Sequence, residues 1–208
     1  MAISLNGSTN VITGVAVGGL PDGIVDTDML AANAVSSAKL ASGVGGKLLA
    51  YQNAVKTDTS TTSSTSYVDI SGLSITMTPA SAASRFRIDY NVNFAVPPSV
   101  YSGSLKLIKV VGGTTTDDIY IGDAAGNRTR CSNWTWSTNA SYSSFPVDVF
   151  SGSLIHHPNT TSAVTFKLQF KSHYTNNFTV YVNRNEPDAD SSTHGRGVSS
   201  ITVMEVAA

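Results

Sequence analysis

Two tryptophans, Trp134 and Trp136, lie two positions apart in a segment rich in Ser, Thr and Asn. In extended backbone, side chains two positions apart project to the same side, so both indole rings share one face. An aromatic surface surrounded by amides and hydroxyls suits a sugar, which stacks on the rings and hydrogen-bonds through its hydroxyls. The segment therefore predicts a saccharide-binding surface, and the candidate ligand-binding residues are Asn133, Trp134, Trp136, Asn139 and Tyr142.

The same pair of tryptophans has a second interpretation. Tryptophan is heavily buried in most folded proteins, so both rings can instead pack inside the domain or between subunits. The sequence leaves these two interpretations open, because it does not give the exposure of either ring.

Other residues with chemical potential do not form a recognisable site. His156 and His157 are adjacent, so in a strand their rings point to opposite faces and cannot share one metal ion. Asp188 and Asp190 resemble the start of a calcium loop, but the segment lacks the glycine and the bidentate glutamate that such a loop requires. Cys131, the one cysteine, is most simply a small buried side chain. We expect no metal and no cofactor.

Signatures of common catalytic sites are missing from the sequence. It contains no Gly-x-Ser-x-Gly elbow, no glycine-rich phosphate loop and no His-Glu-x-x-His pair. The paired carboxylates of a glycoside hydrolase are recognised by their separation in space, which a sequence does not give. We expect no catalytic residues and no enzyme activity, with a carbohydrate-active enzyme as the alternative.

The composition favours β-structure and excludes two classes of partner. Ser, Thr and Asn make up 66 of the 208 residues, and these side chains compete with helical backbone hydrogen bonds. Thirteen basic and 14 acidic residues give a formal net charge of −1, which does not fit a phosphate-neutralising surface for nucleic acid. No run of about 20 apolar residues occurs, so we expect no membrane insertion.

Two segments alternate strictly between apolar and polar residues, as a strand does when one face is buried. Phe86, Ile88, Tyr90, Val92 and Phe94 share one face of the first segment. The second places Val164, Phe166, Leu168 and Phe170 on one face. Shorter strands are expected over Leu48–Val55, Tyr67–Ile70, Leu73–Met77, Leu105–Val111, Ile119–Ile121, Phe178–Val182 and Ile201–Val206.

Gly, Pro and Asn clusters separate these runs, among them a predicted turn at Ser71–Gly72 and another at Gly112–Gly113. Many short strands without an alternating helix predict an all-β fold, an antiparallel β-sandwich that is jelly-roll-like. Periodicity does not decide between a jelly roll and another sandwich topology.

The first 46 residues differ from the rest of the chain. They contain no aromatic residue, and their apolar positions are sparse, with several of them five residues apart. Five matches neither a helix nor a strand, although Asp28 could cap a short helical turn over residues 29–40. This extended, Gly/Ala/Ser-rich arm has too few large side chains for a core, so its aliphatic residues need a partner surface. They are Ile24, Met29, Leu30, Val35 and Leu40.

Two stretches resemble bacteriophage tail-fibre proteins. Residues 19–24 and 28–40 are similar to small-residue phrases that join an attachment segment to a distal β domain in that family. Residues 181–184, Asp188, Asp190 and residues 197–206 resemble the closing strands of fibre-tip domains, especially in marine and cyanobacterial phages. The two stretches span residues 19–40 and 181–206, so they flank most of the rest of the chain.

The resemblance implies a short homotrimeric virion fibre, in which three copies bury each other's sparse apolar positions. It implies a virion-attachment segment over residues 1–20, an extended or short-helical trimerising neck over 21–46 and a distal β-sandwich over 47–208. The partners would be other virion proteins (tail, neck or capsid) and a host-surface glycan, and the protein would be located in the virion after assembly in the host cytoplasm. Alternatives are a head-decorating fibre or capsid cement protein without a receptor role, and a cellular sugar-binding module.

Overall fold

The computed structural model describes residues 4–6, 11–13, 48–97, 101–137, 146–174 and 178–207. The chain divides into two units, residues 1–45 and 46–208. All regular structure in the described residues is β-strand, and accordingly they include no helix that could span a membrane. In the first unit, β1 (Ser4–Asn6) pairs antiparallel with β2 (Val11–Thr13).

The second unit contains two antiparallel sheets. In the first sheet, β6 (Arg85–Ala95) lies between β13 (Ser199–Val206) and β10 (Asp148–His156), and β3 (Leu48–Lys56) pairs with the free edge of β13. β12 (Val180–Val182) pairs with the end of β6, and β4 (Ser60–Thr62) pairs with β12.

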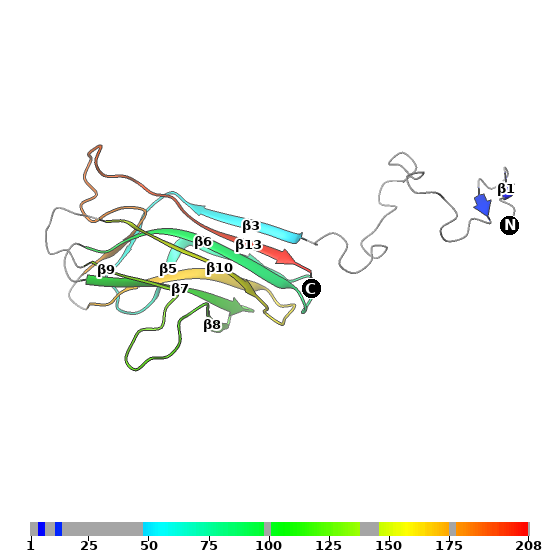
Figure 1. Ribbon diagram of the computed structural model, residues 1–208, viewed down its shortest axis with the longest axis horizontal. Helices are drawn as coiled ribbons and strands as arrows, with labels where there is room; N and C mark the ends of the chain where they lie inside the picture. Colours follow the sequence, from blue (N-terminus) through cyan, green and yellow to red (C-terminus); the bar gives the residue numbers. More distant parts are fainter. Residues whose placement is uncertain are drawn as a thin grey trace. The chain divides into compact units, whose positions relative to one another are not determined.

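In the second sheet, β11 (Val164–Ser172) lies between β5 (Val68–Met77) and β7 (Tyr101–Val111). The other edge of β7 pairs with β9 (Asn133–Ser137) along its first half and with β8 (Thr115–Ile119) along its second. Figure 1 shows β3, β13 and β6 along the upper side of the sandwich, with β7 and β8 along the lower side.

The strand order is that of a jelly roll. The sheets read β3-β13-β6-β10 and β5-β11-β7-β9, so most strands that are consecutive in the chain lie in opposite sheets. The predicted all-β sandwich is therefore confirmed, and the topology that periodicity left open is resolved. The oligomeric part of that prediction stays a prediction.

The core lies between the two sheets and contains both predicted strand faces. Phe86, Ile88, Val92 and Phe94 have no exposed surface, and Tyr90 is 4% exposed. From the opposite sheet, Val164, Phe166, Leu168 and Phe170 are equally buried. Aromatic rings from the two sheets contact each other in the interior: the ring centroids of Phe86 and Phe166 are 5.4 Å apart.

Some predicted boundaries are wrong. The turn expected at Ser71–Gly72 is a bulge inside the continuous strand β5, where Gly72 has a φ of 85° and the register against β11 shifts. β8 ends at Ile119, whereas the sequence predicted a strand over 119–121. Gly112 and Gly113, both at positive φ, do form the predicted turn between β7 and β8.

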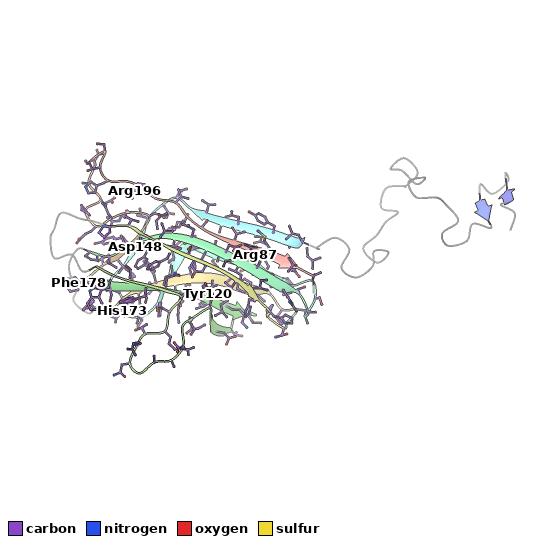
Figure 2. The ribbon with its side chains drawn as sticks, in the orientation of Figure 1. Arg87, Tyr120, Asp148, His173, Phe178 and Arg196 are labelled. Atoms are coloured by element: carbon purple, nitrogen blue, oxygen red, sulfur yellow. The ribbon has the colours of Figure 1, made fainter. Side chains whose placement is uncertain are left out.

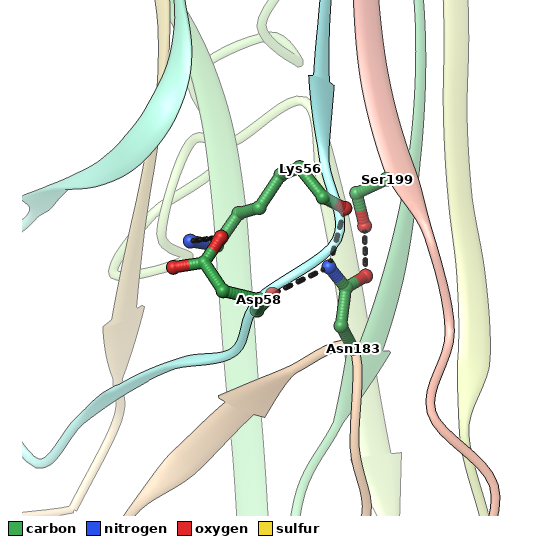
Figure 3. A network of polar contacts seen from close by, with 4 residues as sticks. All are labelled: Lys56, Asp58, Asn183 and Ser199. Carbon is green, nitrogen blue, oxygen red and sulfur yellow. Dashed lines mark hydrogen bonds and ion pairs between the residues drawn. The ribbon is translucent and has the colours of Figure 1, made fainter.

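A buried polar network joins β3, the end of β12 and β13 of the first sheet (Figure 3). The Asn183 carboxamide nitrogen donates to the carbonyl oxygens of Lys56 and Asp58, both at 2.8 Å. Its oxygen accepts a hydrogen bond from the Ser199 hydroxyl at 2.5 Å. The buried Lys56 ammonium pairs with the exposed Asp58 carboxylate at 2.9 Å, and this hydrogen bond lowers the pKa of Asp58.

Candidate functional site

Strand β9, which carries the two tryptophans, is fastened to the opposite sheet through its inward-facing side chains. The Asn133 carboxamide oxygen accepts a hydrogen bond from the Tyr90 hydroxyl at 2.6 Å, and its nitrogen donates to the carbonyl oxygen of Ser151 at 3.2 Å. Two residues on, the Thr135 hydroxyl donates to the Asp148 carboxylate at 2.5 Å. These bonds fix which face of β9 points inward.

Tyr90 reaches Asn133 because its cross-strand neighbour in β10 has no side chain. Gly152 pairs with Tyr90, and a Cβ built on Gly152 would lie 2.5 Å from the tyrosine ring. Glycine is therefore required here by the close approach of an aromatic ring. Burial raises the pKa of the Tyr90 hydroxyl, which keeps it protonated as a hydrogen-bond donor.

Trp134 and Trp136 consequently project from the outer face of the second sheet, since side chains alternate along a strand. They are 52% and 49% exposed, and their ring centroids are 6.1 Å apart at an interplanar angle of 81°. Neither ring enters the sandwich interior, so the alternative in which both pack inside the domain is wrong for this chain.

The cross-strand partners of the tryptophans are two small buried serines of β7. Trp134 lies opposite Ser104 and Trp136 lies opposite Ser102. On the other side of β7, Ser104 lies opposite Lys171 of β11. Lys171, Ser104 and Trp134 thus form one row across three strands, with their side chains on the same outer face.

Ser104 is fully buried because two rings cover it. Its hydroxyl hydrogen-bonds with the Tyr67 hydroxyl at 2.8 Å and with His173 Nε2 at 3.0 Å. The Tyr67 ring contacts two ammonium groups, with Lys106 Nζ 4.5 Å and Lys171 Nζ 5.1 Å from its centroid. Burial raises the pKa of Tyr67 to about 12. Burial, followed by the neighbouring Lys171 charge, lowers the pKa of His173.

A pocket of about 470 Å³ opens beside this row. Its lining comprises Arg128, Thr129 and Cys131 from the segment before β9, Trp134 from β9 and His173 from just after β11. None of the described residues that line the pocket carries a carboxylate. Burial raises the pKa of the half-buried Cys131 thiol, which therefore contributes an uncharged wall. In Figure 2, His173 and Asp148 lie toward one end of the sandwich and Arg87 toward the other.

The remaining sequence candidates are distributed elsewhere. Asn133 lies next to the tryptophans in sequence, but its carboxamide faces the opposite way and is engaged with Tyr90. It therefore positions the strand, and the structure does not bring its side chain together with the rings. Asn139 and Tyr142 lie outside the described residues, as do the predicted trimer-contact residues Ile24, Met29, Leu30, Val35 and Leu40.

The other groups considered as metal ligands have different partners. The His156 ring packs edge-on against Phe166, whereas His157 Nε2 contacts the Ala82 carbonyl oxygen at 3.2 Å. The Asp188 carboxylate pairs with Arg196 at 2.7 Å and with Arg184 at 3.3 Å. Across the described residues, no group of three or more His, Cys, Asp or Glu could hold a metal ion.

Sequence reasoning missed the polar residues that accompany the pocket. Tyr67, Ser104 and the Lys171–His173 segment are far apart in the chain, and only the strand register places them in adjacent rows. A partial signal existed in the alternation of β11, which puts Lys171 on the polar face of a predicted strand. Nothing in the sequence indicated that β9 would pair on the other side of Ser104.

Comparison with known proteins gives little beyond this geometry. No protein-family model matches the chain, and no curated protein sequence matches it. Among solved structures, it is similar to a protein chain in the structure of the infectious bursal disease virus Gt strain, with a TM-score of 0.35 and 7% identity over 76% of this chain. For the Gx strain of that virus the TM-score is 0.34, with 10% identity over 77% of this chain. The VP2 subviral particle of infectious bursal disease virus gives 0.31, with 9% identity over 77%.

The chain spans 42%, 37% and 42% of the lengths of those three chains. At these TM-scores the likeness carries no conclusion about function.

Proposed function

We propose that this chain is a short structural fibre of a tailed-bacteriophage virion, and that its β-sandwich binds a glycan on the host surface. In this proposal residues 1–20 attach to the particle, residues 21–46 form a trimeric neck and the sandwich is the distal domain. The N-terminal phrases and the closing strands that resemble fibre proteins support the fibre role. The sparse aliphatic residues of the first 46 positions, which need a partner surface, support the trimer.

The observation that carries the binding function is the presentation of Trp134 and Trp136. Each indole is about half exposed, on a strand whose opposite face is fastened to the other sheet by Asn133 and Thr135. Exposed tryptophans held on rigid backbone lose little entropy on binding and offer flat faces for stacking. A jelly roll by itself implies no function, so the proposed binding rests on this surface and not on the fold.

The experiment is a binding assay with the full chain and the Trp134→Ala/Trp136→Ala double variant. Fluorescently labelled protein is applied to a panel of bacterial cells and to an array of envelope polysaccharides. We expect the double variant to lose binding at least about 10-fold, because each lost stacking contact is worth about 1 kcal/mol. The control is Val198→Ala, which shortens an exposed apolar side chain (53%) just before β13, away from both tryptophans in the sequence.

A double variant that folds and binds as the wild type does would overturn the proposed glycan surface. The location of the chain tests the fibre role, and cryo-EM of the particle gives it directly. Density at the tail or neck supports the proposal, whereas density over the capsid alone would indicate a decorating or cement protein. Release of reducing sugar from envelope polysaccharide would indicate an enzyme instead.

A further inference from the structure

The pocket beside Trp134 is bordered by positive charge, and no carboxylate among the described residues neutralises it. Most described lysines and arginines pair with a carboxylate within 4 Å, namely Lys56, Arg87, Lys106, Lys109, Lys167, Arg184 and Arg196. Lys171 and Arg128 have no such partner among the described residues. Arg128 lines the pocket, and its guanidinium donates a hydrogen bond to the Ala125 carbonyl oxygen at 3.4 Å.

Lys171 belongs to the same site. It lies in one row with Ser104 and Trp134, and its charge influences the ionisation of both Cys131 and His173, which line the pocket. Its own pKa is lowered, chiefly by burial and also by the nearby Lys106 ammonium. An anion entering the pocket would relieve this repulsion and restore a partner to a partly desolvated ammonium.

We propose that this pocket binds the anionic group of an acidic saccharide whose ring stacks on Trp134. Lys171 and Arg128 supply the charge, and Thr129 and His173 supply polar groups beside it. The shared chemistry is a sugar bearing a carboxylate or a phosphate. A neutral saccharide would leave both cations without an anionic partner. This inference rests on the proposed glycan-binding function and narrows its ligand class.

The chain contains a built-in probe for the test. Its two tryptophans are Trp134 and Trp136, so the whole intrinsic tryptophan fluorescence reports on this surface. The titrants are uronic acid tetrasaccharides of gluco, manno and galacto configuration, each as the free acid and as its methyl ester. Hexose 6-phosphates with the parent hexoses form a second arm, which distinguishes phosphate from carboxylate.

We expect at least one free acid or phosphate to change the fluorescence, and its neutral counterpart to bind about 10- to 100-fold more weakly. Lys171→Gln and Arg128→Gln should each weaken binding of the charged ligand by a similar factor and leave binding of the neutral ligand unchanged. The matched controls are Lys167→Gln, on the same strand but paired with Asp69, and Arg85→Gln at the start of β6. Both controls should bind the charged ligand as the wild type does.

The outcomes separate this inference from the wider function. Equal binding of an acid and its ester, or loss of binding in Lys167→Gln as large as in Lys171→Gln, overturns the anion site and leaves glycan binding standing. The anion site is also overturned if none of the charged probes changes the tryptophan fluorescence. The proposed glycan surface itself fails if the tryptophan double variant binds cells and polysaccharide arrays as the wild type does.

Discussion

Among single residues, Asn183 makes the most unusual set of contacts. It follows β12 at a positive φ of 63° and is fully buried. Its backbone nitrogen donates to the carbonyl oxygen of Asn93, and its backbone oxygen accepts from the nitrogen of Gly197. Together with its three side-chain hydrogen bonds, these contacts tie β3, β6, β12 and β13 at one point (Figure 3). Asparagine suits the position because it tolerates left-handed backbone and carries both a donor and an acceptor.

We expect Asn183→Ala to lower the free energy of unfolding by about 3–4 kcal/mol, because it strands buried carbonyl groups and strains the backbone. Asn183→Gly should cost about 1 kcal/mol less, since glycine accepts the positive φ. Urea denaturation measures both values. Asn159→Ala is the control, because Asn159 also has a positive φ (54°) but is exposed. If all three variants lost the same small amount, the buried network would contribute nothing.

Tyr67, on the outer face of the second sheet, makes the free energy of unfolding depend on pH in the alkaline range. Burial raises its pKa to about 12, above the value of about 10 in an unfolded chain. The folded state therefore holds this proton more tightly, and the contribution is complete below about pH 10 and is lost as the pH rises toward 12. We expect stability to fall by on the order of 1 kcal/mol over this range, because solvent screens this partly exposed group, and Tyr67→Phe to reduce that fall. Urea denaturation at several pH values measures it, and an unchanged slope in the variant would contradict the assignment.

At the scale of elements, the strands whose inner faces were predicted are those with one wholly apolar face. The alternation of Phe86 and its apolar neighbours in β6 with polar residues predicts a strand with one buried face. β10 escaped prediction because Val149 and Ile155 are apolar on its exposed face, while glycine occupies a position on its inner face at Gly152. That glycine is explained only by Tyr90 of another strand, which no local pattern contains.

The candidate site divides in the same way between local and long-range information. The shared face of Trp134 and Trp136 follows from their spacing and was predictable. Their exposure was not, because it depends on Asn133 and Thr135 finding partners in the opposite sheet. Pairing partners in a jelly roll are distant in sequence, so the charged row beside the rings required the strand register.

The anchoring of β9 gives a test at this scale. In Gly152→Ala, the new Cβ would lie 2.5 Å from the Tyr90 ring, so the ring must move and its hydroxyl must leave Asn133. We expect a loss of about 1–3 kcal/mol in urea denaturation, together with a changed tryptophan emission. Tyr90→Phe removes the hydroxyl alone and should change the emission with a smaller loss. Gly195→Ala is the control, because a Cβ there meets nothing within 4 Å. Unaltered emission in both test variants would show that β9 is held by other contacts.

At the scale of the whole molecule, apolar side chains gather on the outer face of the first sheet. The register places Tyr51, Met204, Arg87 and Ile155 in one row across four strands. Tyr51 is 54% exposed and Ile155 is 67% exposed, with Val149 at 57% on the same strand as Ile155. Side-by-side packing of three sandwiches in the proposed trimer would cover such a face, and the tryptophan surface lies on the other sheet.

The proposed trimer predicts the behaviour of a truncated chain. We expect the full chain to sediment as a trimer at micromolar concentration, because residues 1–46 have sparse apolar positions and no core of their own. Deletion of residues 1–46 should leave a folded sandwich, since the buried hydrophobic core of the described residues lies within residues 70–203. The dissociation constant of the trimer should rise about 10-fold or more. Any remaining association should disappear with Val149→Glu, which places a charge at an exposed apolar position of the first sheet, whereas Lys167→Glu on the other sheet should not affect it. Analytical ultracentrifugation measures all four proteins. A full chain that is monomeric at micromolar concentration would remove the physical basis of the fibre proposal, and the tryptophan surface would then belong to a single-copy binding domain.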